Sequence, residues 1–79
     1  MAQQYLSYEE TLKLNLEFVK WVQAHGYKRM KLAEITGYSN ALGFYKGHVK
    51  HIPKVEADKI MEVIHREPIG NMVDTERKN

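Results

Sequence analysis

Apolar residues between positions 8 and 24 recur at the three- and four-residue spacing of a helix and form two neighbouring stripes. One stripe consists of Leu12, Leu16 and Val19, and the other of Leu14, Phe18, Trp21 and Val22. The alternation from Leu12 to Phe18 also suits a strand, but the length of the pattern and a capping box that begins at Ser7 favour a helix. We therefore predict a helix from about Tyr8 to Ala24, ended by Gly26.

Two shorter helices are predicted next, each followed by a glycine. The first runs from about Lys28 to Thr36 and ends at Gly37; Leu32 and Ile35 face inward, with Met30 as a further candidate for that face. The second is capped by Ser39 or Asn40 and continues through Leu42, Phe44 and Tyr45 to Gly47. The segment from Gly47 to Ile52 is predicted to be a loop.

A fourth helix is predicted to begin at Pro53, because the first helical position needs no N–H group. Its apolar face follows i, i+3, i+4, i+7 spacing through Ala57, Ile60, Met61 and Ile64. Pro68 stops this helix. The fold class is therefore all-α, a small domain of four to five helices over residues 1–68. Residues 69–79 form a partly ordered tail, whose apolar residues Ile69, Met72 and Val73 pack on the body or on a partner subunit, with disorder of its last residues as the alternative.

Composition excludes several classes of protein. The 79 residues contain no cysteine, which excludes disulfides, thiolate metal sites and cysteine nucleophiles. No apolar run approaches the roughly 20 residues that span a bilayer, and the N-terminus has no signal-peptide pattern. His48 and His51 have no carboxylate nearby to complete a metal site. We therefore expect a cytoplasmic protein that is not an enzyme, with no metal, cofactor, small-molecule substrate or membrane partner.

The net charge of +2 is unevenly distributed along the chain. Residues 27–54 contain six lysine and arginine side chains against the single acid Glu34, whereas the segments before and after them are net acidic. A basic block between acidic ones suggests a surface that binds a polyanion. Chance clustering on a solvated surface is the alternative that charge alone leaves open.

A helix-turn-helix pattern lies within the basic block. Two short helices that cross closely need a small residue on the first helix, here Ala33, and a turn with positive φ four residues later, here Gly37. Tyr38 then supplies an apolar plug and Ser39 a cap. This stretch resembles the helix-turn-helix of phage repressors and of LacI-type headpieces. The broader helix order over residues 8–65 resembles the lambda-repressor-like family, which includes Cro.

The resemblance breaks down on the second helix of the motif. In the family register, the next two core positions fall on Gly43 and Lys46, and both are normally apolar. A turn that is one residue shorter places Leu42 and Tyr45 there instead, so we expect a shortened or irregular turn. Thr36 also replaces the commoner apolar residue, although threonine is familiar there in the LacI-like version.

The resemblance implies a sequence-specific transcriptional regulator, such as a repressor from a phage or mobile element, that binds operator DNA as a homodimer. The implied base contacts are Ser39, Asn40, Ala41 and Phe44. The implied phosphate contacts are Lys28, Arg29, Lys31, Lys46, Lys50 and Lys54. Capping is the alternative role for Ser39 and Asn40, and a core position is the alternative for Phe44. The dimer surface is either the tail or the first helix.

A second hypothesis is a protein-interaction module that has the same fold and does not bind DNA, such as a phage inhibitor of a host protein. The modest net charge and the irregular second helix of the motif favour it, whereas the basic block and the well-preserved turn favour DNA.

Overall fold

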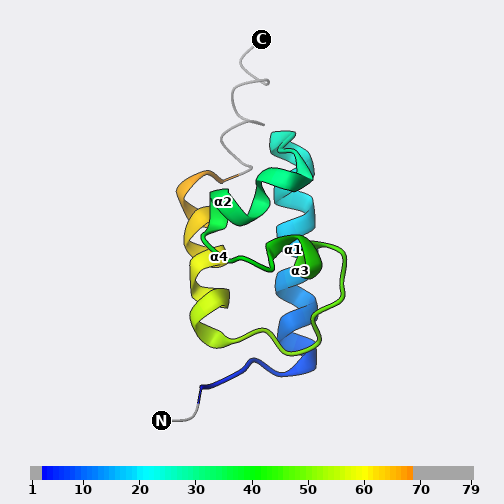
Figure 1. The fold of residues 1–79 in the computed structure, drawn as a ribbon, viewed down its shortest axis with the longest axis vertical. Helices are drawn as coiled ribbons and strands as arrows, with labels where there is room; N and C mark the ends of the chain where they lie inside the picture. Colours follow the sequence, from blue (N-terminus) through cyan, green and yellow to red (C-terminus); the bar gives the residue numbers. More distant parts are fainter. Residues whose placement is uncertain (1–2, 69–79) are drawn as a thin grey trace.

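The computed structural model describes residues 3–68, and this part of the chain is all-α. Its two longest helices, α1 and α4, run beside each other along the long axis of the molecule (Figure 1). The elements are α1 (Tyr8–His25), the 3-10 helix η1 (Arg29–Lys31), α2 (Leu32–Thr36), α3 (Ala41–Tyr45) and α4 (Lys54–Arg66). The all-α prediction is confirmed for these residues, whereas the predicted tail at 69–79 lies outside them.

The helix α1 forms as its end signals predict. The Ser7 hydroxyl accepts the Glu10 amide at 3.1 Å, and the Glu10 carboxylate accepts the Ser7 amide at 3.1 Å, which completes the capping box. At the other end Gly26 adopts φ 72°, a left-handed conformation that suits glycine because it has no Cβ. The predicted helix is confirmed and extends one residue further, to His25.

Only one of the two apolar stripes on α1 enters the core. Phe18 and Trp21 are completely buried, and Leu14 and Val22 nearly so. Leu12 and Leu16 of the other stripe retain 44% and 61% of their surface in water. Burial of the first stripe against α3 and α4 holds the fold together, and the second stripe remains on the surface.

The second predicted helix is divided into η1 and α2. Met30 lies on η1 with 81% of its surface exposed, so the prediction that it faces inward is wrong. Leu32 is fully buried and Ile35 partly buried, as expected. The helix α2 ends at Gly37, which adopts φ 79° and donates its amide to the Ala33 carbonyl at 2.8 Å.

The helix α4 closes the core opposite α1. Pro53 directly precedes its first residue, Lys54, one position before the predicted role. Its buried face consists of Ala57, Ile60 and Val63, with Met61 and Ile64 partly buried at the edge. Lys59 Nζ lies 3.2 Å from a Glu56 carboxylate oxygen and 3.4 Å from the Gly37 carbonyl, so α4 also contacts the turn between α2 and α3.

Both ends of the described chain are held by hydrogen bonds to distant residues. Near the start, Leu6 donates its amide to the Ile52 carbonyl at 2.9 Å, and the Ile52 amide donates to the Thr11 hydroxyl at 3.2 Å. At the far end of α1, the Glu67 carbonyl accepts the indole N–H of Trp21 at 2.8 Å and lies 2.8 Å from His25 Nε2. These contacts fix where α4 begins and ends relative to α1.

Candidate nucleic-acid interface

The segment with the helix-turn-helix pattern folds as α2, a turn at Gly37 and α3, with α3 lying across the middle of α1 (Figure 1). Asn15 of α1 holds α3 in place: its side-chain amide donates to the carbonyl of Phe44 and, at 3.4 Å, to that of Tyr45. Both carbonyls lie in the last turn of α3, and the Phe44 carbonyl also accepts the Gly47 amide at 3.0 Å, so the Asn15 amide adds to the backbone hydrogen bonds that end the helix. Sequence reasoning missed this role, although a polar Asn15 between Leu14 and Leu16 is a visible signal.

The buried face of α3 corrects the predicted register. Ala41 and Phe44 are completely buried, and Phe44 packs against Phe18 with ring centroids 5.7 Å apart. Neither side chain reaches a base edge in this fold, so the predicted base contacts of Ala41 and Phe44 are wrong. Leu42 and Tyr45 are only partly buried. Relative to the family register the core positions therefore shift by two residues rather than one.

Ser39 and Asn40 are the predicted base contacts that remain exposed. Asn40 occupies the N-cap position of α3, but its side chain makes no capping hydrogen bond. A Cβ at Gly43 would lie 2.5 Å from Asn40 Oδ1, so the amide occupies the space that the glycine leaves open. Burial raises the pKa of the neighbouring Tyr38 hydroxyl, and a hydrogen bond from Asn40 acts in the opposite direction.

Two of the predicted phosphate contacts, Arg29 and Lys46, lie at the same end of α3. The guanidinium of Arg29 lies over the ring of Tyr45, 5.9 Å from its centroid. Tyr45 is the last residue of α3 and directly precedes Lys46, which is exposed. Residues 17 positions apart in sequence therefore place positive charge at the same end of α3.

Two other predicted phosphate contacts already have acidic neighbours. Lys31 lies 3.6 Å from Glu34, and Lys54 lies 3.6 Å from Asp58. All four side chains are more than half exposed. Exposed pairs of this kind contribute only about 0–1 kcal/mol, so either lysine can exchange its partner for a phosphate at little cost.

The predicted basic residues do not gather into one cluster. Arg29 follows the C-terminal end of α1, whereas Lys54 donates its amide to the Gln4 carbonyl at 2.8 Å and so lies near the N-terminal end. The 18 residues of α1 are about 27 Å long. Lys28 and Lys50 are exposed near the two ends of this span. The positive charges are thus spread along the length of α1, and α3 lies between the two groups.

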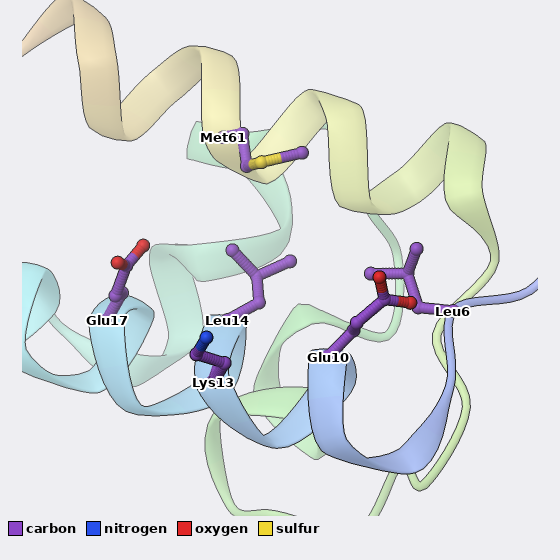
Figure 2. Close-up of a pocket in the computed structure, with 6 residues that line it drawn as sticks. All are labelled: Leu6, Glu10, Lys13, Leu14, Glu17 and Met61. Atoms are coloured by element: carbon purple, nitrogen blue, oxygen red, sulfur yellow. The ribbon is translucent and has the colours of Figure 1, made fainter.

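A hollow of about 300 Å³ lies on another side of the molecule, between α1 and α4. Figure 2 shows Leu14 of α1 and Met61 of α4 pointing into it from opposite sides, with Glu10 and Glu17 at its margin. Leu6 and Lys13 complete the lining. The Glu10 carboxylate is already occupied by the Ser7 amide of the capping box. Among these lining residues there is no serine, threonine, histidine or cysteine to act as a nucleophile or base beside the carboxylates.

Within residues 3–68 no group of three or more histidine or acidic residues has the geometry to hold a metal ion. In the same residues no helix is both long and apolar enough to cross a bilayer. His51, one of the two loop histidines, donates from Nδ1 to the Leu6 carbonyl at 3.1 Å, and His48 is exposed. Comparison of the chain with protein-family models, curated proteins and solved structures finds no match in any of the three.

Proposed function

We propose that this protein is a small sequence-specific DNA-binding regulator of transcription, with a helix-turn-helix of the lambda-repressor-like kind formed by α2, the Gly37 turn and α3. The observation that supports it best is that Arg29, which lies over the Tyr45 ring, reaches the same end of α3 as the exposed Lys46. Positive charge at the C-terminal end of α3 can hold a phosphate backbone while Ser39 and Asn40 at the other end of the same short helix face the major groove.

Base recognition is assigned to a smaller set of residues than the pattern alone implies. Ser39 and Asn40 are exposed at the start of α3, and an asparagine amide can pair bidentately with adenine. Lys28, Arg29 and Lys46 bind phosphates at one end of α3, and Lys50 and Lys54 bind them towards the other end of the molecule. Phosphate contacts outnumber base contacts in this scheme, so affinity depends steeply on salt and sequence discrimination is modest.

The regulator acts by occupying an operator as a homodimer of this cytoplasmic protein. Two copies place two α3 helices on half-sites about 34–36 Å apart, which raises affinity beyond that of one short helix. Binding then blocks or recruits the polymerase. The proposed source is a phage or another mobile element.

The test is a selection of bound duplexes from a random pool, followed by salt titrations of the selected duplex. Enrichment of an inverted repeat supports the proposal. Lys46→Ala should reduce the slope of log affinity against log salt by about 1, because one phosphate contact is lost. Lys13→Ala is the matched control: it also removes one positive charge, but from the lining of the hollow between α1 and α4, and should leave the slope unchanged. Absence of enrichment together with equal slopes for the two variants would refute DNA binding.

A protein-interaction module is the second candidate, and the shortness of α3 favours it. The helix has five residues, and the two whose side chains are fully buried leave few for base contacts. Retention of a host protein by the wild type, at the same affinity by the Arg29→Ala and Lys46→Ala variants, with no duplex enriched, would favour this candidate.

A further inference from the structure

The outer face of α1 exposes an apolar stripe, here named the α1 stripe, that consists of Tyr8, Leu12 and Leu16. These side chains retain 53%, 44% and 61% of their surface in water. They are spaced four residues apart, so they lie on three successive turns of one helix face. The partly buried Val19 continues the same line towards the C-terminal end. A contiguous apolar stripe of this length on a small domain marks a contact with another macromolecule.

Charged residues flank the α1 stripe in an alternating order. Along one side of α1 the exposed residues Glu9, Lys13, Glu17 and Lys20 have negative, positive, negative and positive charges in turn. At 100° of rotation per residue, Glu9 and Lys20 lie at the smallest angles from the stripe around the helix axis, and Lys13 and Glu17 lie at larger angles. Within the described part of the chain, none of these four side chains forms an ion pair at 4.0 Å or less.

This order of charges selects the orientation of a second copy. When an identical helix is laid antiparallel on the stripe, its charges appear in reverse order, so that each charge meets its opposite. In a parallel copy related by a two-fold axis the two charged flanks would lie on opposite edges of the contact, where these charges would not meet. With Leu12 opposite Leu16 of the partner subunit, Glu9 comes within one residue of the level of Lys20 of the partner subunit at both ends of the contact. Two-fold symmetry then satisfies the apolar and the charged positions together.

We propose that the α1 stripe is the contact surface of an antiparallel homodimer, with Leu12 and Leu16 at its centre and Glu9 paired with Lys20 across the two-fold axis. One helix face is smaller than the roughly 800 Å² that each partner contributes to a standard interface. The dimer is therefore weak, with a dissociation constant of about 10 µM or more.

The α1 stripe lies beside the DNA-binding unit rather than within it. Asn15, on the neighbouring face of α1, holds the end of α3, and Gln23 donates to the Tyr45 hydroxyl at 3.5 Å. Pairing two α1 helices therefore also fixes the two α3 helices relative to each other. The inference rests on the proposed function only for the biological role of the dimer, because dimerisation itself is measured without DNA. Failure of either therefore leaves the other to be judged by its own experiment.

The experiment is sedimentation equilibrium of the full chain over about 1–500 µM, a range that brackets the expected dissociation constant. The wild type should change from monomer to dimer across this range. Leu16→Glu should weaken the dimer at least tenfold, and circular dichroism should show a native helix content because Leu16 is exposed. Val55→Glu is the matched control, since Val55 is an apolar residue of α4 with 58% exposure away from α1, and it should dimerise like the wild type.

Charge swaps test the antiparallel orientation. Glu9→Lys places two lysines opposite each other at both ends and should weaken the dimer severalfold, as should Lys20→Glu by pairing two glutamates. The double variant restores opposite charges and should recover wild-type dimerisation. A wild-type chain that stays monomeric throughout, or a Leu16→Glu variant that dimerises as well as the wild type, would overturn the proposal. If the double variant is weaker than both single variants, the antiparallel pairing is wrong.

Discussion

Replacement of Thr36 by valine tests whether the Thr36 hydroxyl stabilises this fold, because the family resemblance alone would predict no effect. In the motifs that this stretch resembles an apolar residue is the commoner one at this position, although threonine is familiar there in the LacI-like version, so valine is expected to be harmless by analogy. In this protein Thr36 is 4% exposed, and its hydroxyl donates to the Leu32 carbonyl at 2.8 Å. The same oxygen accepts the Tyr38 amide at 3.1 Å, directly across the Gly37 turn.

The free-energy cost of this substitution follows from the groups left without partners. Valine has nearly the shape of threonine and a similar helix propensity, so packing and backbone terms change little. The Leu32 carbonyl keeps its position in the helix, but the buried Tyr38 amide loses its acceptor. An unsatisfied buried N–H costs about 1–3 kcal/mol, and the extra apolar surface of valine offsets part of this. We expect a net loss of about 1–2 kcal/mol in the free energy of unfolding.

Urea unfolding followed by Trp21 fluorescence measures this loss, since Trp21 is completely buried and becomes exposed on unfolding. With a slope of about 1 kcal/mol per molar urea for a chain of this size, the midpoint should fall by about 1–2 M. Thr36→Ser is the control, because it keeps the hydroxyl and loses only one methyl group, at a cost of about 1 kcal/mol. A Thr36→Val variant as stable as the wild type would refute the role of the hydroxyl.

Three further outcomes are expected. Gly37→Ala should lower the free energy of unfolding by about 1–2 kcal/mol, because φ 79° strains any residue with a Cβ; an unchanged urea midpoint would contradict this. The hydrogen bond to Glu67, at 2.5 Å, raises the pKa of Tyr27 above 10.0, so stability is full below pH 10 and falls as the pH rises through the raised pKa. Tyr27→Phe should make this alkaline loss smaller in urea titrations about pH 9–11. The Cβ of an alanine at position 43 collides with the Asn40 amide, so Gly43→Ala should stabilise the protein more in the Asn40→Ala background than in the wild type. A double-mutant cycle measures this difference.

The long helices were predictable because their signals are local. The capping box at Ser7 and the glycine at 26 fix the ends of α1 through bonds within a few residues. The same holds for Pro53 at the start of α4 and Pro68 after its end. Prediction of these two helices does not require their packing partners, so the observed bounds agree with the predicted ones to about one residue.

The register of α3 was not predictable, because tertiary contacts determine it. Five residues make little more than one helical turn, too short for a periodicity to be recognised. Phe44 is drawn into the core by Phe18, and the Asn15 amide fixes the carbonyls that follow. Both partners lie about 26–30 residues earlier in the chain, so a pattern within the motif contains no information about them.

The two apolar stripes of α1 are a second feature that the sequence alone does not resolve. Each has helical spacing and similar apolar content, so the sequence alone does not distinguish the stripe that faces the core from the other. The structure buries Phe18 and Trp21 completely and leaves Leu12 and Leu16 in water. A chain of this size has one core to fill, and α3 and α4 fill it from one side of α1. The exposed part of the second stripe therefore has no partner within the described residues, and the alternating charges beside it are the reason for which we propose an antiparallel copy of the same helix as that partner.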